Sequence, residues 1–423
     1  MIIPLLKIEQ KKEHIYTTKI KVKDLKKYVV INFRYPYINS LSSSDQEKFS
    51  KYLNNLQKKG LNVSFSDYSI QRRLQPDKLR SISDYVKKNS NFIPNSIILG
   101  CFNKLVEEGT LDYSYESEII PVEEDLGMYK IDINENYEMT AIDGQHRLAG
   151  LFTSNEPEIE EMELSVVLLF GVSLSTSAKI FIDINSNQKS VDKSLIYDLM
   201  PVLDFNNEKM KLNDRELESI QRCHRICVTF YNNEKSPFYR QIRMLGTGNG
   251  SISQAFLVEE IYPLIHNGVL SDFDLKRQFN VLFNYFNAIR EVFSDDWPVL
   301  EGNFDNKQQE SRAKDILKNK KSQLSKTLGV GAFLKVFPYL NQIVTEELES
   351  SSIKYEDKDY NINQKRLFAK HIMKLKCRIA WSKEEYEKST KTLNQGEQEQ
   401  IYYSETSRSA INKLASEIKR ILV

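Results

Sequence analysis

Two kinds of hydrophobic pattern divide this chain of 423 residues, and their order limits the folds that it can adopt. Up to about residue 204, apolar stretches of strand length alternate with segments whose apolar residues recur every three or four positions. Beyond residue 205 the strand-like stretches fade and helical periodicity dominates. The sequence therefore predicts an α+β (mixed α/β) fold, with an α/β core over residues 1–204 and an α-rich region over residues 205–423.

The clearest local unit covers residues 138–170. Residues 138–142 are strand-like, Asp143-Gly144 is a turn, residues 145–152 have helical periodicity, and residues 164–170 form a nearly continuous apolar strand. A strand, a helix and a strand in sequence favour a right-handed crossover within one sheet. Amphipathic patterns predict further helices over 41–60, 76–89, 173–185, 215–230, 254–265, 274–293, 308–325, 331–349 and 364–381.

Composition excludes several classes of protein. The net charge is only +1, which argues against a general binder of polyanions. No apolar run approaches the roughly 20 residues that cross a bilayer, and the four cysteines are irregularly spaced. We therefore expect a soluble, cytoplasmic protein without a membrane partner.

The turn at residues 143–147 concentrates unusual chemistry in five positions. The first N–H groups of a helix lack partners and carry the positive end of its dipole, and Gly144 permits close approach of an anion. Gln145 and His146 add directional donors, and Arg147 adds a planar cation suited to phosphate. Asp143 would repel phosphate, so a functional role for it requires that it hold a metal ion or orient His146. This pattern predicts a site for an oxyanion, with phosphate as the first choice.

A structural interpretation of the same turn remains open. Asp143 can simply cap the helix, while Arg147 pairs with the surrounding acidic segment. That segment, residues 112–163, holds fifteen acidic residues against Lys130 and Arg147. The first thirty residues show the opposite bias, with eight lysines against three acids.

Further phosphate candidates lie on either side of this unit. Asn187, Gln188 and Lys189 follow a predicted helix, where the lysine can reach a phosphate and the amides can contact a base or water. The alternative is an ordinary helix end at Asn185 followed by a solvated loop. Arg73 belongs to a basic group at the start of the 76–89 helix, with Arg72, Lys78 and Arg80, and we retain Arg73 as the phosphate candidate of that group.

Two patterns in the α-rich region point to DNA or to metal. Basic residues recur every four positions between 366 and 378, so on a helix they form one continuous row: Arg366, Lys370, Lys374 and Arg378. Such a row can follow a nucleic-acid backbone, although ordinary surface helices also carry lysine-rich faces. Cys223, His224 and Cys227 have the spacing of half a zinc site, but no second ligand pair follows, which favours buried core cysteines.

The residues from Asp143 to Arg147 reproduce the signature of the DGQHR-domain family. Three other stretches, 73–95, 181–191 and 236–250, resemble the same family in the same order. That family includes the DndB proteins of DNA phosphorothioate-modification systems and related proteins of phage-defence islands. The resemblance implies a core similar to the ParB/sulfiredoxin fold, in which Gly144 and Arg147 would contact nucleotide phosphates beside Gln145 and His146.

By this resemblance we expect a nucleotide-binding, DNA-associated regulatory protein. Its cofactor would be a nucleoside triphosphate (ATP, GTP or CTP) with Mg²⁺, and its partners would be DNA, other proteins of the modification or restriction system, and further copies of itself. Any hydrolysis would use Arg147 to stabilise charge and Asp143 or His146 as the catalytic base. Two alternatives stay open: a transcriptional repressor without nucleotide turnover, and a metal-dependent nuclease with Asp143 as a ligand.

Overall fold

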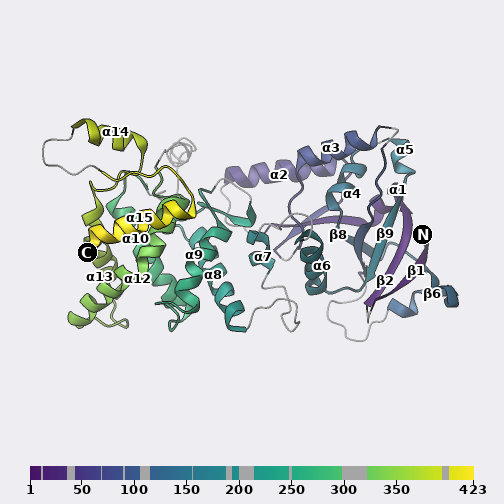
Figure 1. Cartoon of the computed structure of the whole chain (residues 1–423). Coiled ribbons are helices and arrows are strands. Elements are labelled where there is room, and N and C mark those ends of the chain that lie inside the picture. Colours follow the sequence, from purple (N-terminus) through teal and green to yellow (C-terminus); the bar gives the residue numbers. More distant parts are fainter. Residues whose placement is uncertain are drawn as a thin grey trace. The chain divides into compact units, whose positions relative to one another are not determined.

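The computed structural model divides into two compact units (Figure 1). It describes residues 1–10, 13–35, 43–67, 69–88, 91–104, 115–154, 156–186, 193–199, 214–246, 250–297, 322–392 and 400–423. The first unit holds the described residues up to 186 together with Leu199, and the second holds residues 193–198 and those from 214 onward. The boundary predicted at residues 204/205 lies outside the described residues. The predicted mixed α+β class is confirmed.

A nine-stranded mixed sheet forms the centre of the first unit, in the order β4-β3-β8-β5-β9-β2-β1-β7-β6. β8 pairs in parallel with β3 and antiparallel with β5, and β5 in turn runs parallel to β9. The strands are β1 (Ile2–Gln10), β2 (Glu13–Lys21), β3 (Val29–Arg34), β4 (Val63–Ser66), β5 (Ile97–Asn103), β6 (Ile120–Glu123), β7 (Met128–Asp132), β8 (Tyr137–Asp143) and β9 (Glu163–Phe170).

The crossover predicted for residues 138–170 is wrong, although its strands and its helix are present. β5 lies between β8 and β9, antiparallel to the first and parallel to the second. β8 and β9 therefore run in opposite directions, whereas a crossover joins parallel strands. The reason lies outside the local unit, because β5 precedes both strands in the chain and its apolar side chains occupy the centre of the sheet.

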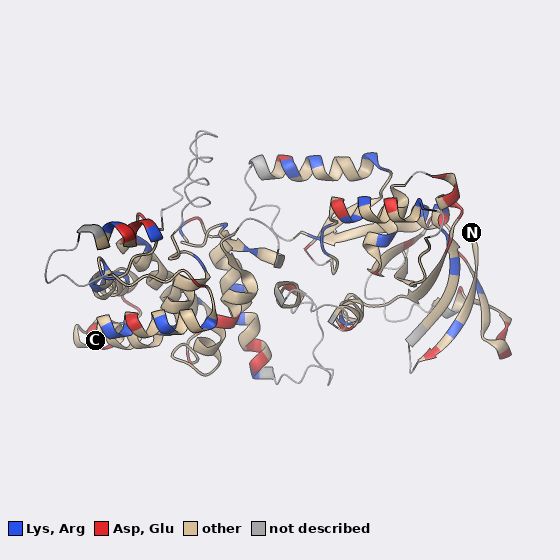
Figure 2. Ribbon diagram, turned by 45° about the horizontal axis from the view of Figure 1, so that its top comes forward, with Lys and Arg blue, Asp and Glu red and all other residues tan. Residues whose placement is uncertain are grey.

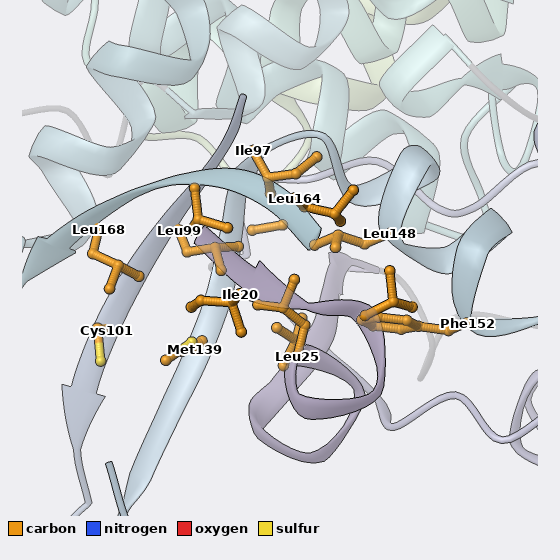
Figure 3. Packing of buried hydrophobic residues seen from close by; sticks show 14 of the residues in the cluster. Ile20, Leu25, Ile97, Leu99, Cys101, Met139, Leu148, Phe152, Leu164 and Leu168 are labelled. Carbon is orange, nitrogen blue, oxygen red and sulfur yellow. The ribbon is translucent and has the colours of Figure 1, made fainter. Parts of the chain in front are cut away.

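Helices on one face of the sheet complete the core of the first unit. Figure 3 shows Leu25 of α1 (Val22–Tyr28) and Phe152 of α4 (Gln145–Phe152) packed among strand residues such as Leu99 and Leu164. α3 (Pro76–Val86) packs against α4 at Gly150, where an added Cβ would lie 2.6 Å from Ile82 Cγ2. This close approach fixes which face of α3 points inward. The remaining helices of this unit are α2 (Ser43–Lys58), α5 (Pro157–Glu160) and α6 (Leu174–Ser186).

The lysine-rich beginning of the chain pairs with the glutamates that precede and begin β9. Lys19 lies 2.9 Å from Glu163, and Lys21 lies 2.8 Å from Glu161. Lys23 also bonds to Glu161. The opposite charge biases of these two distant segments therefore neutralise each other locally. Arg147 pairs with Asp143 of the acidic segment, and among the described residues it does not pair with the glutamates that precede and begin β9.

The second unit is helical, as predicted. Large aromatic side chains fill its interior, including Phe230, Tyr285, Phe286 and Phe333, all essentially inaccessible to solvent. Its helices are α7 (Lys193–Leu199, except Leu199), α8 (Asp214–Asn232), α9 (Gln254–His266), α10 (Leu275–Val292), α12 (Thr327–Ser350), α13 (Tyr360–Ile372), α14 (Lys383–Thr392) and α15 (Arg408–Leu422), with a two-stranded sheet of β10 (Ile242–Arg243) and β11 (Ile252–Ser253). The helix predicted over 308–325 falls almost entirely outside the described residues.

Within the described parts of the chain, no helix combines the length and apolar character that crossing a bilayer requires.

Candidate functional site

The candidate site is the turn that joins β8 to α4. β8 ends at Asp143, Gly144 follows with a φ of 92°, and α4 begins at Gln145. This left-handed backbone conformation favours glycine. A Cβ at Gly144 would also lie 2.6 Å from Ile97 Cδ1 and 3.2 Å from Arg147 Nη2. The predicted strand–turn–helix is therefore confirmed, and two separate physical reasons select glycine there.

The N-terminus of α4 has no side-chain cap in the described structure. Its first intrahelical bond runs from the Leu148 amide to the Gly144 carbonyl, at 3.0 Å. The alternative in which Asp143 caps the helix is therefore wrong. The amides of the first turn retain the positive end of the helix dipole and can bind an anion.

Arg147 connects the turn to residues 95–96, which directly precede β5, through hydrogen bonds. Its Nη2 lies 2.6 Å from Asp143 Oδ2, and its Nη1 donates to the carbonyls of Asn95 at 3.0 Å and Ser96 at 3.2 Å. The Arg147 and Asp143 side chains are both about a quarter exposed. Arg147 thus neutralises the carboxylate that would otherwise repel an anion at this position.

Gln145 is buried, with 3% of its surface exposed. Its Nε2 donates to the Arg72 carbonyl at 2.6 Å, while its Oε1 has no hydrogen-bond partner among the described residues. Buried polar atoms normally have partners, since leaving one unsatisfied costs about 1–3 kcal/mol. The turn therefore contains a buried hydrogen-bond acceptor whose partner is not among the described residues.

His146 is a neutral imidazole at physiological pH. Burial, together with the positive charges of Lys78 and Arg72, lowers its pKa to about 4. Its Nε2 accepts a hydrogen bond from the Gln75 amide at 3.3 Å, so the ring proton lies on Nδ1. The lowered pKa of His146 also indicates that Lys78 and Arg72 create a positive potential at the start of α4.

Arg72 lies in the segment before α3, and Lys78 lies in the first turn of α3 itself. Gln71 Nε2 donates to the carbonyls of Ala141 at 3.1 Å and Ile142 at 2.5 Å, which fixes the segment along β8. The Arg73 guanidinium, in contrast, lies over the Tyr52 ring at 3.8 Å. The sequence contained the relevant basic group, but its helical pattern did not distinguish which members approach the turn. No sequence pattern pointed to Gln71.

The other predicted ligands of this site are not tested. Asn187, Gln188 and Lys189 lie outside the described residues. As for metal binding by Asp143, its carboxylate is paired with Arg147, and the described chain contains no group of three or more His, Cys, Asp or Glu side chains that could hold an ion. The catalytic and metal roles of Asp143 stay predictions.

The continuous basic row predicted for residues 364–381 is wrong. α13 ends at Ile372, a short 3-10 helix follows, and Cys377 adopts a φ of 66° that interrupts the helical path. Lys370 pairs with Glu347 at 2.9 Å, and Lys374 Nζ donates to the Leu422 carbonyl at 3.0 Å. All four basic side chains, Arg366, Lys370, Lys374 and Arg378, are nevertheless exposed. Their DNA-binding role stays a prediction.

The cysteines of the 223–227 pattern are core residues of α8. Both are fully buried, and burial raises the pKa of each thiol. His224 donates from Nε2 to Asp198 Oδ1 at 2.6 Å. Gln254 Nε2 donates to the same carboxylate oxygen at 3.0 Å. This part of the second unit is thus a buried hydrogen-bond network.

The fold and the site define the protein as a two-unit α+β protein with a candidate anion site at a strand–turn–helix. The model of the DndB family, described as DNA-sulfur modification-associated, matches residues 3–219, which is just over half of the chain. The chain therefore belongs to the DndB family. No curated protein and no solved structure is significantly similar to it.

Proposed function

We propose that this protein is a regulatory component of a DNA-sulfur modification system and that it binds a nucleotide phosphate at the N-terminus of α4. Membership of the DndB family supports the assignment of this protein to a DNA-sulfur modification system. The finer assignment to the DGQHR-domain group, with a ParB/sulfiredoxin-like core, belongs to the proposal. It is supported by the strand–turn–helix that carries residues 143–147.

One observation carries the proposal: the α4 N-terminus lacks a described side-chain cap and lies in the positive potential of Arg72 and Lys78. A helix N-terminus attracts anions through its free amides and its dipole. Two added cations strengthen that attraction in a partly desolvated site. The neutral imidazole of His146 can donate from Nδ1 without the cost of burying another charge.

Gln145 supports a nucleotide over a bare phosphate. Its buried Oε1 is an acceptor, and a phosphate dianion offers no donor to it. A ribose hydroxyl or a base amino group offers such a donor. Because Oε1 has no accessible surface in this conformation, the Gln145 side chain must turn before either group can reach it. In this proposal the α4 amides, Arg72 and Lys78 bind phosphate, while Arg147 holds the turn in position.

The residues fit a phosphate better than a divalent cation. The Asp143 carboxylate is already paired with Arg147, so it could hold Mg²⁺ only if that pair opened. Mg²⁺ that enters with a nucleotide is held largely by phosphates and water, and it would supply charge neutralisation there. We therefore propose nucleotide binding as the primary activity. Hydrolysis stays a prediction, and an assay of inorganic phosphate released from the nucleotide tests it.

The test is calorimetric titration and thermal unfolding with ATP, GTP, CTP and inorganic phosphate, in the presence of Mg²⁺. At least one nucleotide should bind and raise Tm, and inorganic phosphate should bind more weakly. Lys78→Glu should weaken binding by at least about tenfold, because it converts an attractive charge into a repulsive one. Lys130→Glu, an exposed change on β7, is the matched control and should bind as the wild type does. Absence of binding by all four ligands, or an unchanged affinity in Lys78→Glu, would contradict the proposal.

A second candidate is a DNA-binding transcriptional repressor without nucleotide turnover. Residues 360–382 contain no acidic residue, and exposed cations cluster there despite the broken helix. Figure 2 shows the charges of this unit on its ribbon. A gel shift on the protein's own promoter tests it: Arg366→Glu with Lys374→Glu should abolish binding, whereas Arg147→Ala and the control Lys413→Glu should not. Binding that survives the double reversal would exclude this surface as the DNA-binding site.

The nuclease alternative gains no support from the described residues, which contain no metal-binding cluster.

A further inference from the structure

α3 presents a buried face and an exposed face that differ sharply in composition. Leu79, Ser83 and Val86 are buried, and this side of the helix packs on α4. The opposite side carries Asp77, Arg80, Ser81, Asp84, Tyr85 and, just beyond the helix, Lys88, all exposed. These six residues line a cavity of about 500 Å³. We call these six residues the exposed face of α3.

The four charges of this face are not used inside the described protein. Asp77 and Arg80 are three residues apart, and Arg80, Asp84 and Lys88 follow at steps of four, a spacing that often gives pairs within a helix. None of the four forms an ion pair with another described residue of the chain. Tyr85, 49% exposed, and Phe92, 68% exposed, add apolar area beside them.

The order of these charges is self-complementary. Read from either end, the face presents opposite signs about a centre at residues 82–83: Asp77 corresponds to Lys88, and Arg80 corresponds to Asp84. A second α3 that packs antiparallel on the first therefore meets opposite charge at each of these positions. Two-fold symmetry then makes every such pair twice, as an isologous interface requires.

We propose that the exposed face of α3 is the interface of a homodimer of this protein. In this dimer Asp77 of each copy pairs with Lys88 of the other, and Arg80 pairs with Asp84. Tyr85 of each copy enters the cavity of the other, close to its Arg80. The proposal rests on the surface of α3 and is independent of nucleotide binding by α4.

The size of the face predicts a weak dimer. α3 has 11 residues, so its length is about 16 Å. That is short for an interface of about 800 Å² per subunit, the usual size for a stable complex. The dimer should therefore form in a concentration-dependent manner, with Tyr85 and Phe92 as its apolar anchors.

A pair of charge reversals tests this geometry with the full-length chain. Arg80→Glu places negative charge opposite Asp84 of the second copy, and Asp84→Arg places positive charge opposite its Arg80. Each variant alone should dimerise at least about tenfold more weakly than the wild type, because two attractive contacts become repulsive. Mixed together, the two variants restore both contacts and should form a heterodimer. Sedimentation velocity at increasing concentration measures each case, with Lys413→Glu on α15 as the control.

For the wild type, the average mass should rise from 49.4 kDa towards twice that value as concentration increases. A wild type that keeps the monomer mass at every concentration would overturn the proposal. The proposal would also be overturned if either single variant dimerised as strongly as the wild type. So would a mixture that stays monomeric while circular dichroism shows both variants folded, since the antiparallel pairing requires the heterodimer.

Discussion

Each of the two units brings an aspartate, a histidine and a glutamine close together. In the second unit the three side chains bond to one another: His224 and Gln254 both donate to Asp198, which is fully buried. Gln254 Oε1 also accepts a hydrogen bond from the Leu245 amide at 3.1 Å. Both ends of the glutamine are satisfied, and the network connects α7 to α8 and α9.

In the first unit the same residue types remain separate. Asp143 bonds to Arg147, His146 accepts a bond from a backbone amide, and Gln145 Oε1 has no partner in the described structure. The histidine faces positive charges in place of a carboxylate. Residue types alone therefore do not define a site. A set that is mutually bonded stabilises the fold, and a set with unused groups can bind a ligand.

Removal of the histidine should distinguish the two sets most strongly. His224→Leu removes one of the hydrogen bonds that the buried Asp198 carboxylate accepts while its charge stays buried, and we expect a loss of about 3–5 kcal/mol in the free energy of unfolding. His146→Leu removes one neutral hydrogen bond and should cost about 1 kcal/mol. Urea unfolding of both variants measures the difference. Equal losses would mean that the two histidines have equivalent structural roles.

Acidification should destabilise the first unit through His146. Its folded pKa of about 4 lies below the ordinary value near 6.5, so the unfolded chain binds the proton more readily. Between pH 7 and pH 4 this difference should lower the free energy of unfolding by up to about 3 kcal/mol. His146→Asn should lack this contribution. The measurement is the difference between the two pH profiles, and parallel profiles would refute the depressed pKa.

Gly144→Ala should destabilise the turn by about 2–3 kcal/mol. Alanine must adopt a φ of 92°, and its Cβ would lie 2.6 Å from Ile97 Cδ1. Gly127→Ala is the matched control, since Gly127 has a φ of 67° but its nearest neighbour would be 3.7 Å away. That control should lose only about 1 kcal/mol. Similar losses in thermal or urea unfolding would mean that packing on Ile97 contributes nothing.

Asp143→Asn should have a small effect on stability, at most about 1 kcal/mol, because the Arg147 pair is partly exposed. Its effect on ligand binding is more informative. Removal of the negative charge should increase nucleotide affinity severalfold in calorimetric titration without Mg²⁺. If affinity instead falls only when Mg²⁺ is present, Asp143 holds the metal.

Much of the first unit was predictable from local pattern. The helices over 41–60 and 76–89, the strand over 138–142 and the glycine turn all follow from periodicity and from the backbone freedom of glycine. The crossover was not predictable in this way, because the position of β5 depends on pairing with strands about forty and seventy residues away. The basic row failed for a local reason, since nothing in its apolar spacing signals the break after Ile372.

The candidate site was located by sequence, but its internal contacts were not. The pattern Asp143-Gly144-Gln145-His146-Arg147 marked the turn and the helix that follows it, but it left open whether Asp143 caps that helix. It could not indicate that Arg147 would bond to Asp143 and to two carbonyls of residues 95–96. Nor could it select Arg72 and Lys78 over Arg73 as the cations whose charges lower the pKa of His146.

The amino-acid sequence by itself determined the secondary structure of most segments, the change from a mixed to a helical region, and the site of the glycine turn. These properties depend on residues within one or two turns of each other, so neighbouring side chains are enough to specify them. Only the tertiary structure decided the strand order, the partner of each charge, and which histidine lies beside a carboxylate. Those outcomes join residues separated by tens of positions, and the folded chain selects them through the packing and charge compensation of all its elements together.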